Sequence, residues 1–144
     1  MERTRSDVTT KPDVDRQALI SAAASARERA YAPYSGYRVG AALLTSAGHI
    51  YEGCNVENAV YPLSMCAERS AVFNAVCAGD EDLVAVAVVT ENGGAPCGSC
   101  RQVLREFGDG ILVLIGDKEG NWRETTVAEL LPDSFSASDL GSGT

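Results

Sequence analysis

Residues 83–90, Leu-Val-Ala-Val-Ala-Val-Val-Thr, form the segment from which the fold of this chain is inferred. The run is apolar without polar alternation, which is typical of a strand buried on both faces of a sheet. Small and apolar residues recur with helical spacing before it, over residues 66–78, and after it, over residues 97–107. A strand between two helices predicts a sheet with helices packed against it.

Further elements are expected on both sides of this segment. Residues 46–48 (Ser-Ala-Gly) predict a tight turn, residues 55–65 a polar loop, and residues 132–144 a loop-like segment. The expected helices cover residues 14–30 and 126–131, and the expected strands cover residues 37–45, 49–53, 111–115 and a short stretch after a turn at 117–121. The resulting order of elements predicts an α/β fold in which helices pack on a mixed five-stranded sheet.

The length and composition fit one globular domain. The chain has 144 residues, of which 45% are hydrophobic and 22% charged, as in ordinary globular proteins. The first residues are polar and lack helical spacing. We therefore expect a disordered tail over residues 1–12 and a single domain over residues 13–144.

Charge and hydropathy argue against several classes of protein. The formal net charge of −8 disfavours a nucleic-acid partner, which would require a basic surface. No apolar run reaches the roughly 18 residues of a membrane helix. Residues 1–17 lack the apolar core of a secretory signal. We expect a cytoplasmic protein, without a membrane partner, that acts on a small molecule.

The five cysteines point to metal or redox chemistry before structural disulfides. Cys54 and Cys77 lie at a strand end and in a helix, where buried free thiols are common. Cys97-Gly-Ser-Cys100 places two thiols on one face at the start of a predicted helix. Such a pair is compatible with a redox dithiol, with half of a structural zinc site, or with a catalytic zinc site that has one further ligand and an open position.

Cys66-Ala67-Glu68 supplies the further ligand that a catalytic zinc site requires. Cys66 also begins a predicted helix, so two helix N-termini would converge on one ion, and their partial positive charge favours thiolates. A structural site lacks its second cysteine pair, and a redox dithiol gives Cys66 no role. We therefore predict one Zn²⁺ bound by Cys66, Cys97 and Cys100. Glu68, in the first helical turn, is expected to reach the surroundings of the ion.

These residues resemble the zinc-binding motif of the cytidine deaminase family. Zinc deaminases have His or Cys two residues before a Glu, followed later by Pro-Cys-x-x-Cys. The chain has Cys66-Ala67-Glu68 and then Pro96-Cys97-Gly-Ser-Cys100. Residues 31–35, 39–43, 53–58, 66–69 and 130–132 also resemble the small, homotetrameric, all-cysteine members. The resemblance spans about residues 14–140. It implies a three-layer α-β-α sandwich and a homotetramer in which neighbouring subunits complete each site.

The resemblance also implies an activity and its proton carrier. The expected reaction is hydrolysis of cytidine and 2′-deoxycytidine to uridine and 2′-deoxyuridine with release of ammonia, as in pyrimidine salvage. Glu68 would take a proton from a zinc-bound water, leaving the attacking hydroxide, and would pass protons to N3 and to the departing amino group. Three thiolates give the zinc site a net charge of about −1. Arg69 is expected to offset this charge by donating hydrogen bonds to a ligating sulfur; an exposed helix charge is the alternative.

Asn55 and Glu57 are the candidate ribose ligands. They are two residues apart in an extended segment, so their side chains project to the same side. By resemblance they bind the ribose 3′-OH, with Val56 between them. The alternative is a turn at a strand end. Tyr37 occupies a position where the family usually has Phe beside the base.

The remaining candidates also come from the resemblance. The backbone of Cys66 and Ala67 is expected to contact the edge of the pyrimidine ring. Phe135 resembles a C-terminal aromatic residue that enters a neighbouring subunit's site, and Tyr61 resembles a loop residue near subunit contacts. Core packing is the alternative for both. His49, the single histidine, is expected at a solvated strand position and not on the metal.

Four other functions are weighed against free-nucleoside deamination. Aminonucleoside deaminases of the blasticidin type share the zinc motif, but the Asn55–Glu57 pair favours a nucleoside. Nucleic-acid deaminases share the chemistry, but the acidic composition disfavours them. A zinc-stabilised binding module needs a closed site and leaves Glu68 without a role. A dithiol redox protein leaves Cys66 without one.

Overall fold

The sheet is centred on β3 (Leu83–Val89), which pairs antiparallel with β1 (Gly40–Thr45) and parallel with β4 (Leu112–Gly116). The edge strands β2 (Ile50–Cys54) and β5 (Trp122–Thr126) pair antiparallel with β1 and β4, giving the order β2-β1-β3-β4-β5. The structure is a computed structural model that describes residues 13–141. The mixed five-stranded sheet predicted from the sequence is confirmed, and the tail expected over residues 1–12 lies outside the described residues.

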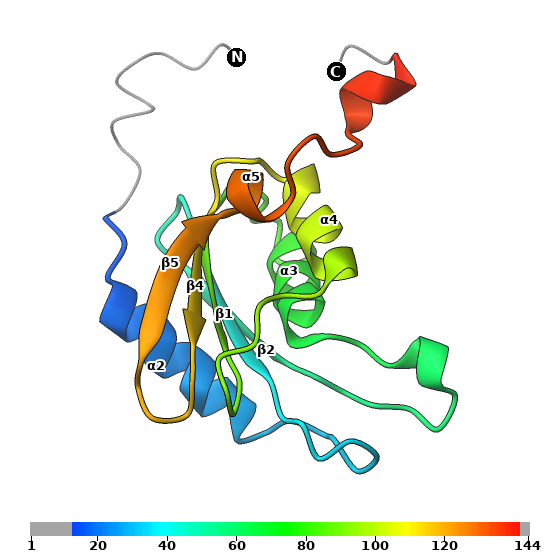
Figure 1. Ribbon diagram of the computed structural model, residues 1–144. Coiled ribbons are helices and arrows are strands. Elements are labelled where there is room, and N and C mark those ends of the chain that lie inside the picture. Colours follow the sequence, from blue (N-terminus) through cyan, green and yellow to red (C-terminus); the bar gives the residue numbers. More distant parts are fainter. Residues whose placement is uncertain (1–12, 142–144) are drawn as a thin grey trace.

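Helices cover both faces of this sheet (Figure 1). One face packs against α2 (Arg16–Arg27), and the opposite face packs against α3 (Ala67–Cys77), α4 (Gly98–Glu106) and α5 (Val127–Leu130). α4 is the crossover between the parallel strands β3 and β4, which no tight turn could join. The three-layer α-β-α arrangement expected from the resemblance is confirmed.

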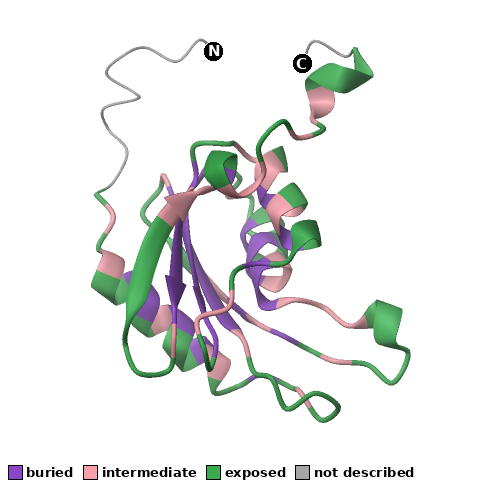
Figure 2. Ribbon diagram, viewed as in Figure 1, coloured by how far each residue is buried: buried purple, intermediate pink, exposed green. Residues whose placement is uncertain are grey.

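The central strands are buried on both faces, as their continuous apolar sequence predicts. Successive β3 residues alternate between two cores: Val86 and Val88 pack on the side of α3 and α4, whereas Ala85, Ala87 and Val89 pack on the side of α2. Figure 2 shows buried residues along the central strands and exposed residues on the outer faces of the helices. The small Ala85 and Ala87 side chains let α2 approach the sheet closely.

β1 is shorter than the strand predicted over residues 37–45, and the Asn55 side chain explains the difference. Asn55 Oδ1 accepts a hydrogen bond from Val39 N at 2.8 Å, and Asn55 Nδ2 donates to the Tyr37 carbonyl at 2.9 Å. A side-chain amide therefore bonds backbone groups that a longer strand would pair with a neighbouring strand. The first helix likewise begins later than predicted, at Arg16, because Asp15 caps it by accepting from Ala18 N at 3.1 Å, and it ends at Arg27 where residue 30 was predicted.

Two short 3₁₀ helices lie in segments predicted to be loops. η1 (Tyr61–Leu63) has Pro62 in its first turn, and the N-terminus of η2 (Ala137–Leu140) is capped by a capping box between Ser136 and Asp139. Neither has a buried residue, so hydrophobic periodicity gives no signal for either. Among residues 13–141, no helix has both the length and the apolar character required to cross a bilayer.

Candidate zinc site

Three cysteine sulfur atoms meet between the N-termini of α3 and α4. The Sγ atoms of Cys66, Cys97 and Cys100 all lie within 4.8 Å of one another. The separation is 3.8 Å between Cys66 and Cys97 and 3.3 Å between Cys97 and Cys100. Cys66 comes from the segment after β2, whereas the other two come from the segment after β3. The convergence predicted from the two motifs is confirmed.

Local backbone geometry places these sulfurs beyond the helix ends. Cys66 and Cys97 are the N-cap residues of α3 and α4, with extended backbone angles, so each helix begins one residue later than predicted. Cys100 lies in the first turn of α4, on the same face as Cys97. The partial positive charge of both helix N-termini therefore acts on the sulfur cluster and favours thiolates.

The cluster fits zinc by ligand chemistry and by spacing. Thiolates select Zn²⁺ over hard cations such as Mg²⁺ and Ca²⁺. Two sulfurs on a tetrahedral zinc ion with bonds of about 2.3 Å lie about 3.8 Å apart, close to the separations found here. Within residues 13–141, no His, Asp or Glu joins the three cysteines. Three protein ligands with an open fourth position are characteristic of catalytic zinc, with one ion per chain.

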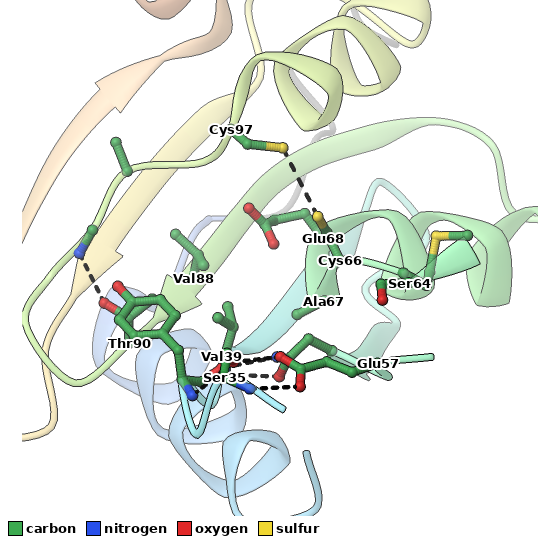
Figure 3. A pocket seen from close by; sticks show the side chains of 15 residues that line it. Ser35, Val39, Glu57, Ser64, Cys66, Ala67, Glu68, Val88, Thr90 and Cys97 are labelled. Carbon is green, nitrogen blue, oxygen red and sulfur yellow. Dashed lines mark hydrogen bonds between the residues drawn. The ribbon is translucent and has the colours of Figure 1, made fainter. Parts of the chain in front are cut away.

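Glu68 lies beside this cluster in the first turn of α3. Its exposed fraction is 4%, and Figure 3 shows its carboxylate on the same side of the pocket as the sulfurs of Cys66 and Cys97. Burial raises the pKa of Glu68, and the negative charge of Cys66 acts in the same direction. A carboxyl group with a raised pKa next to a metal site can both accept and donate a proton near neutral pH.

Arg69 contacts the sulfur cluster from the same helical turn. Its Nη2 donates to Cys66 Sγ at 3.1 Å. Hydrogen bonding from the Cys100 thiol and from Arg69 lowers the pKa of Cys66 to about 5, and the same interaction with Cys66 raises the pKa of Cys100. Arg69 Nε is buried without a hydrogen-bond partner among the described residues. Nη2 of the guanidinium therefore faces the Cys66 sulfur directly.

The cluster forms one end of a cavity of about 350 Å³, a size typical of small-molecule sites. Its wall comes from the segment before β1, the loop after β2, the N-terminus of α3, the end of β3 and the loop before α4. The lining residues are Ser35, Tyr37, Val39, Asn55, Glu57, Ser64, Met65, Cys66, Ala67, Glu68, Val88, Thr90, Gly94, Ala95 and Cys97 (Figure 3).

Asn55 and Glu57 both line this cavity, and their polar atoms already have partners. The Asn55 side chain accepts a hydrogen bond from Val39 N and donates one to the Tyr37 carbonyl. Glu57 Oε1 accepts from the backbone N–H groups of Tyr34 and Ser35 at 2.9 and 3.0 Å, and Oε2 accepts from the Ser35 hydroxyl. The hydrogen bond from Ser35 lowers the pKa of Glu57, which keeps it ionised at neutral pH. Oε2, which accepts one hydrogen bond, retains capacity to accept another.

Of the other four predicted substrate residues, two line the cavity and two lie outside it. Tyr37 and Ala67 line the cavity. Val56 does not; it forms isolated β-bridges to Tyr31 and Met65 and is 46% exposed. Phe135 lies outside the cavity of its own chain, 58% exposed, and its carbonyl accepts from Gln102 Nε2 at 2.9 Å.

Sequence reasoning missed several lining residues and misplaced one thiol. Ser35 holds Glu57, and Thr90 holds the loop before α4 by accepting from Gly94 N at 2.8 Å. Ser35 lies in the segment 31–35 that resembles the deaminase family, whereas no sequence pattern indicates a role for Thr90. Cys77, predicted to be buried, is exposed because it lies off the buried face of α3. His49 is exposed and contacts Asp80, away from the cluster.

Comparison with known proteins gives the same picture. Residues 13–115 match the family described as the cytidine and deoxycytidylate deaminase zinc-binding region. The chain is 49% identical over 130 residues to a cytidine deaminase of Sporosarcina psychrophila, covering 88% of this chain and 96% of that protein. It is 42% identical over 131 residues to the cytidine deaminase of Mycobacterium tuberculosis, covering 90% and 96%.

Solved structures agree with these sequence matches. The crystal structure of a cytidine deaminase from Burkholderia pseudomallei aligns with a TM-score of 0.81 at 50% identity, covering 85% of this chain and all of that one. The cytidine deaminase structure from Mycobacterium tuberculosis aligns with a TM-score of 0.76 at 42% identity, covering 85% and 98%. With its three converging cysteines and buried glutamate, the chain belongs to the cytidine and deoxycytidylate deaminase family of zinc enzymes.

Proposed function

We propose that this chain hydrolyses cytidine and 2′-deoxycytidine to uridine and 2′-deoxyuridine, releasing ammonia. The observation that carries the proposal is the buried Glu68 carboxylate beside three sulfurs within 4.8 Å of one another, at one end of a cavity of nucleoside-site size. A zinc ion held by Cys66, Cys97 and Cys100 would supply a polarised water of lowered pKa. Such a reaction places the chain in pyrimidine salvage.

Glu68 is the proton carrier in the proposed reaction. Its carboxylate accepts a proton from the attacking water and donates it to N3 of the cytosine ring, which makes C4 more electrophilic. It then takes the proton of the new C4 hydroxyl and delivers it to the amino group, which leaves as ammonia while the C4 carbonyl forms. Its raised pKa suits both steps, because a carboxyl group that titrates nearer neutrality gives protons as readily as it takes them.

Arg69 offsets the negative charge of the three thiolates. Its Nη2 bonds Cys66 Sγ directly, so the sulfur donates less charge to a bound ion. This charge balance favours ionisation of water at the site, which a −1 zinc–thiolate cluster would otherwise oppose.

The nucleoside is held by residues that line the cavity. Glu57, with Asn55 beside it, accepts a hydrogen bond from the ribose 3′-OH through capacity left on its ionised carboxylate. The Tyr37 ring stacks beside the base, and the backbone at Ala67 contacts the pyrimidine edge. Val56 contributes by holding the segment between Asn55 and Glu57 against Met65.

The charge of the cavity wall supports a free nucleoside over a nucleotide or a polynucleotide. Of the described residues that line this cavity and the adjoining hollow beside Tyr34 and Tyr61, none is Lys or Arg. Glu57 lines both. A 5′-phosphate would therefore meet negative charge without a compensating cation, as would a DNA or RNA backbone.

Exposed apolar side chains next to the cavity support a homotetramer. Two loops project from one end of the molecule (Figure 1) and carry the exposed Tyr31, Tyr34, Val60, Tyr61 and Leu63. Clusters of this kind mark interfaces between protein chains. In the tetramer, Phe135 reaches a neighbouring subunit's site. We further propose that residues 13–144 are one catalytic domain and that the protein acts in the cytoplasm.

An ultraviolet assay on cytidine tests the proposed function. Turnover is expected with one zinc per chain, loss of turnover after chelation, and recovery when zinc is returned. Glu68→Gln is expected to retain zinc but lose at least about a thousandfold in kcat. Cys77→Ser, an exposed thiol outside the cluster, is the matched control for Cys97→Ser, which is expected to lose zinc.

The same assay compares the competing functions. Blasticidin, 2′-deoxycytidine 5′-monophosphate and single-stranded DNA are offered in place of cytidine at equal concentration. Deamination of any of them in preference to cytidine and 2′-deoxycytidine would contradict the proposal. So would near-normal turnover by Glu68→Gln.

A further inference from the structure

The Tyr37 hydroxyl makes a contact that the proposed reaction does not require. It donates to Asn92 Oδ1 at 2.7 Å and so joins the segment before β1 to the loop after β3. Tyr37 lines the cavity, and the loop that contains Asn92 runs on to Cys97. The bond therefore links the wall proposed to face the base to the segment that carries a zinc ligand.

The loop over residues 91–96 is folded around this contact. Thr90, 3% exposed and labelled in Figure 3, accepts through Oγ1 from Gly94 N at 2.8 Å. The same hydroxyl donates to Asn92 Oδ1 at 3.4 Å. Gly93 has a φ of 78°, in the left-handed region that favours glycine. Asn92 Oδ1 thus accepts two hydrogen bonds, one from the Thr90 hydroxyl after β3 and one from the Tyr37 hydroxyl.

The Tyr37 hydroxyl also packs against the backbone of this loop. A Cβ atom on Gly94 would lie 2.7 Å from Tyr37 Oη, so the phenol occupies the space that a side chain would need. At its other end, Tyr37 is fixed through its backbone: its carbonyl accepts from Asn55 Nδ2 at 2.9 Å, and its N–H donates to Ser35 Oγ at 2.9 Å. Tyr37 therefore spans the cavity wall from the ribose residues to the loop before α4.

We propose that the Tyr37–Asn92 hydrogen bond is a clasp that positions residues 91–96, and through them Cys97 and the cavity wall, for zinc retention and nucleoside binding. Through this bond both residues act by positioning, apart from the contact of the Tyr37 ring with the base that the proposed function assigns. Because Asn92 engages the hydroxyl, the ring of Tyr37 can meet a base as a phenylalanine would. The substrate-binding part of this inference rests on the proposed function; the zinc-retention part rests on the sulfur cluster alone.

Two substitutions remove the clasp from either side. Tyr37→Phe deletes the donor and Asn92→Ala deletes the acceptor. A single net hydrogen bond corresponds to about a three- to tenfold effect. Each variant is expected to raise the KM for cytidine, and the rate of zinc transfer from the holoenzyme to a chromophoric chelator, by about that factor. The kcat is expected to change less than about twofold, because Glu68 is held by α3 and not by the loop.

The double variant and the conservative variant separate a clasp from two independent contacts. Tyr37→Phe combined with Asn92→Ala is expected to match Asn92→Ala alone, because Asn92→Ala already deletes the bond that Tyr37→Phe removes. Asn92→Asp keeps an oxygen acceptor and is expected to stay within about twofold of the wild type. Tyr31→Phe, which removes an exposed tyrosine hydroxyl outside the cavity lining, is the matched control.

Zinc transfer is measured on the holoenzyme and needs no substrate. If cytidine is not turned over, the proposed function fails, and zinc release alone still decides the clasp. Wild-type release rates in Tyr37→Phe and Asn92→Ala would overturn it. Multiplying effects in the double variant would also overturn it, as would Asn92→Asp behaving like Asn92→Ala. Unfolding midpoints of all variants establish that each is folded at the assay temperature.

Discussion

Replacing Gly53 by alanine is expected to displace the zinc site without altering any residue in it. Gly53 is buried in β2, beneath α3. A Cβ atom there would lie 2.5 Å from Ala67 O and from Ala71 N, and 3.1 Å from Ala71 Cα. These are backbone atoms, which cannot rotate aside as a side chain can. The first turns of α3 must therefore move away from the sheet.

The size of the movement follows from these contacts. Restoring an ordinary separation of about 3.5 Å requires a shift of about 1 Å. The turn that moves carries Cys66 and Glu68, and metal–ligand distances tolerate only about 0.2 Å. A misplacement of about 1 Å can cost about a hundredfold in rate. We expect Gly53→Ala to lose about a hundredfold in kcat/KM and to release zinc faster, with an overpacking cost of about 1–3 kcal/mol in the free energy of unfolding.

Gly40→Ala is the matched control for this experiment. Gly40 lies on the neighbouring strand with its open side toward α2, where a Cβ would be 2.0 Å from Ala23 O and 2.4 Å from Arg27 N. This clash is at least as severe, but α2 contributes no residue to the sulfur cluster or to the cavity. Gly40→Ala is expected to lose stability while keeping zinc and kcat/KM per folded molecule.

The assay combines urea unfolding, zinc content per chain and cytidine turnover, all below the unfolding midpoint of each variant. Zinc content and kcat/KM within twofold of the wild type in Gly53→Ala would refute the reasoning, because α3 would then tolerate the added methyl group. Equal losses of activity in both variants would also refute it. Activity would in that case follow stability and not the position of α3.

Three further outcomes are expected. Arg69→Gln removes the hydrogen bond to Cys66 and should speed zinc release about tenfold, and an unchanged rate with unchanged kcat would remove its assigned role. Glu57→Gln should raise the KM for 2′-deoxycytidine about tenfold but leave that for 2′,3′-dideoxycytidine nearly unchanged, because only the former has a 3′-OH; equal effects on both would count against ribose binding. The hydrogen bond from Thr45 lowers the pKa of Asp80, so the carboxylate stabilises the fold above its unfolded pKa of about 4 and loses this effect as the pH falls through the lowered folded value. Asp80→Asn should therefore lower the melting temperature at pH 7 and converge with the wild type in acid; a pH-independent difference would contradict this.

The layers of the fold were predictable because burial leaves a direct trace in the sequence. The apolar run of β3 requires cover on both faces, and the helical spacing on either side supplies it. Element ends were less predictable where one side chain bonds the backbone. Asn55 takes the backbone groups at residues 37 and 39, so β1 begins at Gly40 although the apolar pattern starts earlier.

The zinc ligands were predictable because metal chemistry restricts residue type and spacing together. Two cysteines three residues apart at one helix start, and a third before a glutamate at another, leave few alternatives to one shared ion. The cavity wall was not predictable in the same way. Asn92 acts through a contact with Tyr37, which is 55 residues away in the chain, and Thr90 acts through hydrogen bonds within the same loop. Neither belongs to a pattern that local chemistry requires.

The position of α3 depends on small residues outside the zinc motif. Ala67, Ala71 and Ala75 are completely buried and face the sheet, where Gly53 provides space for the helix backbone. Larger side chains on either surface would hold α3 away and carry Cys66 out of reach of the other two sulfurs. α4, by contrast, sets both of its thiols by itself, since Cys97 and Cys100 lie in one turn. The shared site therefore depends on how helix-to-sheet packing places α3 against α4, and a methyl group on β2 tests that placement without altering any zinc ligand.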